Sequence, residues 1–248
     1  MNDRSRPGEG GSEDQAAAKQ LDASILSRVA DIAVTFDTAA AVKFLDLVLG
    51  DCWSGRIGVC AIGNGPIRHA HFQWIKDAVR QAEAWDGQKP IGVYFRVTML
   101  PPQGIIKGRG TAADAHMLNF LWADLDYGTV GHKAPPSGHP LPATEEDARN
   151  LIKGMPEPTL TVHSGGGLYP IWVLDKPILI TDDNRADIEK LSERWQNTIS
   201  RRAEKLQVHY GNVGNLDRLL RLPGTINRKD ELERPCRVIE YTGERLEL

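Results

Sequence analysis

The chain has 248 residues, with 41% hydrophobic residues, 25% charged residues and a formal net charge of −3. This composition indicates a globular protein with enough residues for one large domain or two small lobes, and no apolar run has the length of a membrane span or a signal-peptide core. The weakly negative total excludes a uniformly basic surface, although a local basic groove for nucleic acid is still possible.

The cysteine pattern argues against both a disulfide framework and a cysteine-rich zinc site. The chain has three cysteines, Cys52, Cys60 and Cys236, and no CxxC pair. An odd, widely spaced set is typical of reduced thiols in an intracellular protein. We therefore expect a cytoplasmic protein without a membrane partner.

The first half of the chain is predicted to be an αβ unit that follows a polar tail. Residues 1–20 are rich in glycine and charge at their start, and we expect them to be disordered. We expect an N-terminal unit at 21–110. Within it, apolar periodicity and helix-breaking residues predict a helix at 38–50 that ends at Gly50, a strand at 56–63, a second helix at 69–87 and a second strand at 92–100.

The second half shows an ordered alternation of strands and helices. The expected elements are a strand, a helix opened by Thr144, a hairpin of two strands, a long helix ending near Leu206 and a last strand, within residues 119–222. The order β-α-β-β-α-β is that of the ferredoxin-like or RRM-like fold. We predict an α+β protein with an RRM-like unit at 111–248, in which the first strand lies beside the last. A further strand is expected in PCRVIEYTG.

Two aspartates interrupt an apolar strand in LWADLD, residues 121–126. Side chains alternate along a strand, so Asp124 and Asp126 point the same way, roughly 7 Å apart. Beside the predicted last strand, Asp217 would join them, and three carboxylates suit two Mg²⁺ or Mn²⁺ ions for in-line displacement at phosphorus. The alternative is a plain DxD at the end of a strand.

A glycine-rich turn and a basic segment accompany these acids. His163, Ser164, Gly165, Gly166 and Gly167 form a hairpin turn whose amides could cradle a phosphate, with a simple flexible hairpin as the alternative. Between residues 194 and 229 eight basic residues face only two acidic ones. Part of this excess fits a solvated helix face, whereas arginines near Asp217 suit bidentate phosphate binding.

The strand ending in DxD, the Ser/Gly-rich hairpin and the acid followed by RLPGTINRK together resemble the archaeo-eukaryotic primase superfamily. The resemblance covers residues 90–240 and is nearest to the primase-polymerase domains of phages, plasmids and integrated elements. It implies a two-lobed core, with an N-terminal αβ unit packed on the RRM-like unit. It also implies that Asp124, Asp126 and Asp217 hold two Mg²⁺ or Mn²⁺ ions.

The same resemblance implies the nucleotide contacts. The hairpin, from His163 to Gly167 with Tyr169, would bind the triphosphate of an NTP or dNTP, together with Arg221, Asn227 and Lys229. Further phosphate or DNA contacts would come from Lys107, Arg109, Arg218 and Arg228. One position departs from the family pattern, because Tyr169 stands where a small-x-His motif has its histidine. Either His163 supplies the imidazole across the hairpin, or Tyr169 donates a hydrogen bond without a positive charge.

These implications lead to the expectation of a DNA primase and polymerase of a mobile element. Its partners would be a single-stranded DNA template, nucleoside triphosphates and a helicase, fused or in trans. Trp172 is a candidate for stacking on bases, with burial in the core as its alternative. Two rival functions are a catalytically silent replication-initiation or origin-binding module and a metal-dependent nuclease.

Overall fold

The computed structural model describes residues 35–50, 54–63, 65–105, 108–136, 138–211 and 213–248. Residues Thr35–Leu248 form one compact unit. The predicted tail at 1–20 lies outside the described residues, as do Cys52 and Lys107. No helix in the described ranges is both long and apolar enough to cross a membrane.

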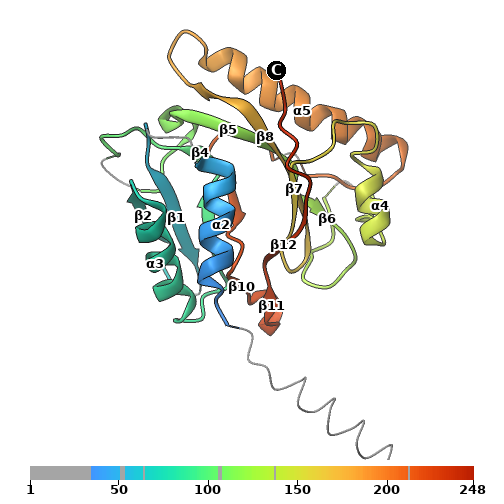
Figure 1. Cartoon of the computed structure of the whole chain (residues 1–248). Helices are drawn as coiled ribbons and strands as arrows, with labels where there is room; N and C mark the ends of the chain where they lie inside the picture. Colours follow the sequence, from blue (N-terminus) through green and yellow to red (C-terminus); the bar gives the residue numbers. More distant parts are fainter. Residues whose placement is uncertain (1–34, 51–53, 64, 106–107, 137, 212) are drawn as a thin grey trace, which may run out of the picture. The chain divides into compact units, whose positions relative to one another are not determined.

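The first of two large sheets is antiparallel, with strand order β2-β1-β3-β9. Its strands are β2 (Arg68–Phe72), β1 (Ile57–Ile62), β3 (Gly92–Arg96) and β9 (Leu219–Arg221). Helices α2 (Thr38–Leu49) and α3 (Ile75–Asp86) pack beside it, as Figure 1 shows. Asp37 caps α2 by accepting a hydrogen bond from the amide of Ala40.

Most elements predicted in the first half are confirmed, and one is corrected. The helix at 38–50 and the strands at 56–63 and 92–100 are present, although the last is divided into β3 and β4 (Thr98–Met99). The predicted helix at 69–87 is wrong in its first part, because Arg68–Phe72 is strand β2 and the helix begins at Ile75. Pairing with the buried β1 decided this segment, since Phe72 lies opposite Ile57.

The second sheet has the order β12-β7-β8-β5-β4. Its strands are β12 (Arg237–Tyr241), β7 (Leu160–His163), β8 (Gly167–Leu179) and β5 (Met117–Trp122), and the short β6 (Leu125–Asp126) also pairs with β8. Helix α5 (Arg185–Lys205) runs along this sheet beside β5 and β8, and α4 (Glu145–Asn150) stands at the β6 side (Figure 1). The predicted order of strands and helices from 119 to 222 is confirmed.

The pairing of the last strand in that order differs from the prediction. We expected the strand at 216–222 to lie beside the strand that carries Asp124, whereas β9 pairs with β3 in the first sheet. The free edge of β5 is taken by β4, with Thr98 opposite Leu118. The residues just before β9 are hydrogen-bonded to the chain that connects β3 of the first sheet to β4 of the second. Val97 donates to the carbonyl of Arg218, and Thr98 Oγ1 donates to that of Leu216.

A line of aromatic rings joins the two sheets through a single core. The ring centroids of Phe44 on α2 and Phe95 on β3 lie 5.1 Å apart, and Phe95 is 6.2 Å from Phe120 on β5. Phe120 continues to Trp122 at 6.1 Å, and all four residues are buried. Aromatic contacts such as these, edge-to-face at both ends of the line and tilted between Phe95 and Phe120, add to the burial of apolar area, so the two sheets are held as one hydrophobic unit.

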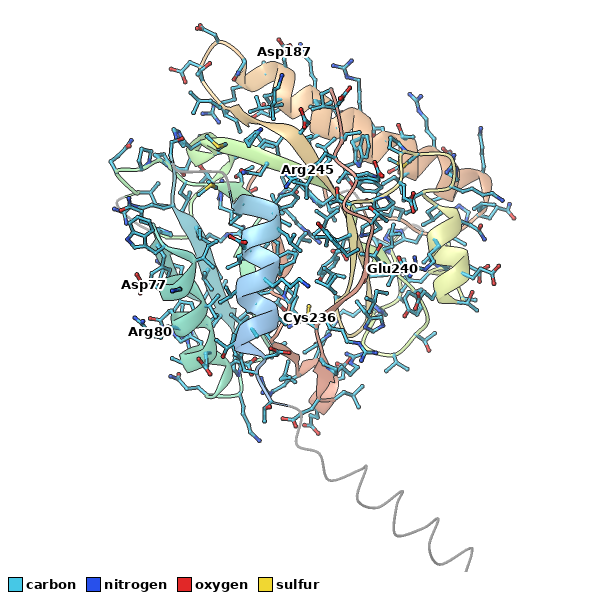
Figure 2. The ribbon with its side chains drawn as sticks, viewed as in Figure 1. Asp77, Arg80, Asp187, Cys236, Glu240 and Arg245 are labelled. Carbon is cyan, nitrogen blue, oxygen red and sulfur yellow. The ribbon has the colours of Figure 1, made fainter. Side chains whose placement is uncertain are left out.

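Two ion pairs lie on the surface, outside this core. Asp77 and Arg80 lie on the outer side of α3 and pair at 3.0 Å, whereas Cys236 lies in the interior (Figure 2). Glu240 of β12 pairs with Arg149 of α4 at 2.9 Å. Two 3-10 turns and a small ribbon complete the fold, namely η1 (Ala112–Asp114), η2 (Lys229–Glu231) and the antiparallel pair β10 (Ile226–Asn227) and β11 (Arg234–Pro235).

Candidate active site

The two aspartates of LWADLD lie at the end of the central strands of the second sheet. Asp126 lies opposite Gly167 in the pairing of β6 with β8, and the same register places Asp124 opposite Tyr169. Residues directly opposite on antiparallel strands share a face, so both carboxylates and Tyr169 point to one side. This confirms the prediction that Asp124 and Asp126 share a face.

Helix α5 and the chain before β9 hold the strand end that carries these acids. Gln196 of α5 donates its Nε2 hydrogen to the carbonyl of Trp122 at 2.7 Å. The indole of Trp122 donates to the carbonyl of Val213 at 3.0 Å, and the Tyr210 hydroxyl is hydrogen-bonded to the backbone of Asp124. These hydrogen bonds lie in the interior and hold the backbone at Trp122 and Asp124 in place.

The charge of Asp124 affects the ionisation of Asp126. The pKa of Asp126 is raised to about 6, first by burial and then by the negative charge of Asp124, while His132, Lys229 and Arg218 act in the opposite direction. His132 Nδ1 lies 3.6 Å from Asp126 Oδ2. Two mutually repelling carboxylates with hard oxygen donors fit a divalent cation such as Mg²⁺ or Mn²⁺.

Two arginines form ion pairs with two of the three predicted aspartates. Arg218 donates to Asp124 Oδ2 at 2.8 Å, and Arg109 Nη2 lies 3.6 Å from Asp217 Oδ2. Asn215 also donates to Asp217 at 3.1 Å. Over the described residues, no three His, Cys, Asp or Glu side chains are grouped so that they could hold a metal ion. In this arrangement Asp217 is therefore tied to Arg109, and only Asp124 and Asp126 present carboxylates next to each other.

The glycine turn is packed closely against its neighbours. A Cβ added at Gly165, whose φ is +84°, would lie 2.9 Å from the Cβ of Asn227 and 3.0 Å from that of Arg234. A Cβ at Gly167 would lie 2.7 Å from the carbonyl oxygen of Leu125. Gly167 donates its amide hydrogen to Ser164 Oγ at 3.0 Å. Glycine is therefore needed at the first and third positions of the turn for close approach.

His163 and Tyr169 lie on opposite sides of the hairpin. His163 pairs with Leu168, the neighbour of Tyr169, so its ring points to the other face. Its Nδ1 accepts from the amide of Gly165 at 3.1 Å, which leaves the hydrogen of the neutral ring on Nε2, 3.0 Å from the Tyr127 hydroxyl. Burial lowers the pKa of His163. Burial followed by the charge of Asp124 raises the pKa of Tyr169 well above its usual value, so its hydroxyl stays protonated beside the carboxylates.

The segment RLPGTINRK joins the first sheet to the glycine turn. Arg221 is 5% exposed, stacks over the ring of Tyr94 at 4.7 Å and donates to the Tyr94 hydroxyl at 3.0 Å. Asn227 donates to the carbonyl of Ser164 at 3.2 Å and accepts from the amide of Lys229 at 3.1 Å. The structure thus brings Asn227 and Lys229 to the same turn as Asp126.

Two residues singled out in the sequence have other partners. Arg228 makes two hydrogen bonds of 3.1 Å with the buried carboxylate of Asp86, and it also pairs with Glu233. Trp172 is fully buried, donates to the carbonyl of Pro156 at 2.7 Å and packs edge-to-face on Trp195. Trp172 is therefore a core residue and not one exposed for stacking on bases.

His132 and Arg234 belong to the site and were not anticipated. His132 Nε2 lies 2.8 Å from the carbonyl oxygen of Gly166 and so connects Asp126 to the glycine turn. Arg234 lies opposite Asn227 in the β10–β11 ribbon. The only sign of Arg234 in the sequence is a basic residue at the end of ELER, where two glutamates give the segment a net negative charge.

Comparisons with known proteins give similarity in fold. No protein-family model and no curated protein matches the sequence. The structure is similar to the AEP domain of the cyanophage S-2L primase-polymerase, with a TM-score of 0.57 and 16% identity over 86% of this chain and 95% of that chain. The chain has the fold of an archaeo-eukaryotic primase-polymerase domain.

Two further solved structures give weaker superpositions. The primase RepB′ matches with a TM-score of 0.46 and 13% identity over 83% of this chain and 58% of its own. The catalytic domain of the same primase, in complex with initiator DNA, matches with the same score and identity over 87% of its own chain. The α+β primase-polymerase fold expected from the sequence is confirmed by the cyanophage domain.

Proposed function

We propose that this chain is a DNA primase-polymerase that joins NTPs or dNTPs on a single-stranded DNA template in the replication of a mobile element. The observation that carries the proposal is the meeting of Asp124 and Asp126 with the glycine turn, Asn227 and Lys229 at one place in a primase-polymerase fold. An acidic pair beside a basic, glycine-lined turn is the donor set that nucleotidyl transfer requires. A helicase, fused or in trans, would expose the template.

Asp124 and Asp126 would hold the divalent ions, with Asp217 as the third candidate ligand. Bound there, Mg²⁺ or Mn²⁺ would supply positive charge at the attacking hydroxyl and at the leaving pyrophosphate. The raised pKa of Asp126 agrees with this role, because a site built for a cation is unfavourable for two bare carboxylates. Arg218 and Arg109 would neutralise Asp124 and Asp217 when no ion is bound.

The chain's own groups would position the triphosphate. In the reaction the primer 3′-oxygen forms a bond to the α-phosphorus, the bond to pyrophosphate breaks, and the hydroxyl proton passes to water. Lys229 would offset charge on the phosphates, and the Tyr169 hydroxyl would donate a hydrogen bond from the carboxylate face. The Ser164–Asn227 hydrogen bond would keep the turn next to this lysine.

Primer synthesis on single-stranded DNA with Mn²⁺ or Mg²⁺ tests the proposal. We expect Asp124→Asn to lose synthesis and to keep most of its DNA binding, since it removes a metal ligand and adds no bulk. Asp77→Asn, on the exposed side of α3, is the matched control and should remain active. Absence of product with every metal and template tried, in a protein that is folded, would sink the enzyme assignment.

A catalytically silent DNA-binding module is the second candidate. It is favoured by one observation, namely that Arg218 and Arg109 already neutralise Asp124 and Asp217. Such a module would bind single-stranded or origin DNA with unchanged affinity in EDTA and in Mn²⁺. Incubating labelled DNA with Mg²⁺ and without nucleotides completes the test, because cleavage under those conditions would indicate a nuclease.

A further inference from the structure

The side chain of Arg234 lies next to two backbone segments, and each has a glycine at the point of contact. A Cβ added at Gly131 would lie 2.9 Å from its Nη2, and one added at Gly166 would lie 3.6 Å from its Nη1. The Cβ of Arg234 itself would come within 3.0 Å of a Cβ at Gly165. The guanidinium therefore lies against the glycine turn, at the end of the turn away from the pairing of Gly167 with Asp126.

The guanidinium of Arg234 forms no ion pair among the described residues, although the charge of Asp230 acts on it from a longer distance. None of their carboxylates lies within ion-pair distance of it, and its buried Nε has no hydrogen-bond partner. A second arginine, Arg221, repels it, and the Nε of Arg221 is also buried and without a hydrogen-bond partner. Burial, followed by the charge of Arg221, lowers the pKa of Arg234.

This arrangement is unfavourable in the protein alone. A partly buried charge without a carboxylate partner loses part of its hydration, and the like charge of Arg221 adds repulsion. Arg228 lies between Arg221 and Arg234 in the sequence. By contrast with them, it forms ion pairs with Asp86 and Glu233. Arg221 donates to the carbonyl of Ile91 and to the Tyr94 hydroxyl but, like Arg234, has no carboxylate partner among the described residues. Two such arginines in one place suit a phosphate, because the guanidinium fork matches phosphate oxygens.

We propose that Arg234, supported by Arg221, binds the terminal phosphates of the incoming nucleotide, so that the triphosphate runs along the glycine turn from Asp126 to Arg234. This inference rests on the proposed function and assigns to it a phosphate contact that the sequence motifs did not contain. His132, which contacts both Asp126 and the Gly166 carbonyl, lies along the same turn.

Binding of inorganic tripolyphosphate to the whole chain, in EDTA and without DNA, tests the inference independently of catalysis. We expect Arg234→Gln to bind tripolyphosphate roughly tenfold or more weakly by calorimetry, the loss typical of a charged hydrogen-bonding partner. Arg234→Lys should recover part of the affinity. Arg237→Gln, an exposed arginine of the neighbouring strand β12, is the matched control and should bind as the wild type does.

A second readout separates ligand binding from a structural role. Because Arg234 is unpaired, Arg234→Gln should melt at the same temperature as the wild type or higher without ligand, and it should lose the stabilisation that tripolyphosphate gives. A lower melting temperature with unchanged tripolyphosphate binding would overturn the inference. So would weaker binding of a single-stranded oligonucleotide with unchanged tripolyphosphate binding, since that assigns Arg234 to the DNA backbone. If Arg234-dependent tripolyphosphate binding occurs in a chain that makes no primers, the proposed function fails and this phosphate site stands.

Discussion

Arg218 donates a hydrogen bond of 2.8 Å to Oδ2 of Asp124, and the two residues come from different sheets of the fold. Arg218 immediately precedes β9 of the first sheet, whereas Asp124 lies between β5 and β6 of the second. The pair is largely shielded, with 34% and 14% of the two side chains exposed. Charge compensation of the central carboxylate is therefore supplied across the junction of the two sheets.

Arg218→Gln is predicted to strengthen Mn²⁺ binding severalfold. The substitution removes a positive group that competes with the cation for Asp124, and it should cost about 1 kcal/mol of unfolding free energy for the partly exposed ion pair. Calorimetric titration with Mn²⁺ measures the first effect and urea unfolding the second. Arg201→Gln, exposed on α5, controls for the change in net charge. Equal or weaker Mn²⁺ binding by Arg218→Gln would show that Asp124 is not a metal ligand.

The raised pKa of Asp126 predicts a metal-free stability that falls as pH rises. The folded pKa is about 6, above the ordinary value of 3.8, so between these values the folded protein holds a proton that the unfolded chain has lost. The unfolding free energy should therefore decrease from pH 4 to pH 6 through this group and stay at its reduced level above pH 6. Urea unfolding in EDTA across this range measures the slope.

Asp126→Asn is the control for this pH dependence, because asparagine does not titrate. The variant should lose this component of the slope and be more stable than the wild type at pH 7 without metal. Mn²⁺ affinity of the wild type should also decline below pH 6, because the ion competes with the proton. An identical pH profile in the variant and the wild type would assign the slope to other groups.

Gly165→Ala is predicted to destabilise the protein by about 1–3 kcal/mol. Alanine is strained at a φ of +84°, and its Cβ would be 2.9 Å from that of Asn227, so the contact between the hairpin and the β10–β11 ribbon must open. Gly166→Ala is the internal control, since its nearest neighbours would be at 3.6 Å, an ordinary contact distance. Thermal unfolding of the two variants gives the comparison, and equal losses would mean that close packing does not explain the glycine at 165.

Tyr169→Phe and His163→Ala should separate the two candidates for the family histidine. Tyr169 faces Asp124, so loss of its hydroxyl should raise the Michaelis constant for nucleotide. His163 faces Tyr127 and bonds the hairpin backbone, so its loss should reduce stability with little effect on that constant. Steady-state kinetics together with thermal unfolding makes the comparison. The reverse pattern would place the imidazole at the nucleotide.

Arg228→Gln is predicted to reduce stability by about 3 kcal/mol or more and to leave nucleotide affinity unchanged at permissive temperature. Arg228 and Asp86 are 12% and 3% exposed, and removing one partner leaves a buried charge. Asp86 also accepts from the amide of Ile226, so the ribbon depends on this pair. Urea unfolding measures the loss, and a stable variant with impaired nucleotide binding would instead assign Arg228 to the phosphate site.

The order of elements from 119 to 222 and the shared face of Asp124 and Asp126 were predictable because both depend on local rules. Alternation of side chains along a strand requires only two residues of spacing, and the hairpin around Ser164–Gly167 follows from turn chemistry. The capping box that begins α4, with Thr144 and Asp147 bonded reciprocally, also reflects short-range sequence. Such features need no knowledge of distant segments.

Partners that come from distant segments were decided only by the tertiary structure. Local sequence makes Leu219–Arg221 a strand but does not say which sheet edge is free, and β4 occupies the edge of β5 that β9 was expected to take. The side of the hairpin on which His163 and Tyr169 lie depends on their register with β6 and β7. Arg234 becomes a candidate phosphate ligand only because the ribbon folds back on the glycine turn without placing a carboxylate of the described residues within ion-pair distance of it. Sequence by itself determined which chemical groups the chain carries on each strand, whereas long-range packing determined which of those groups are neutralised and which remain available to a ligand.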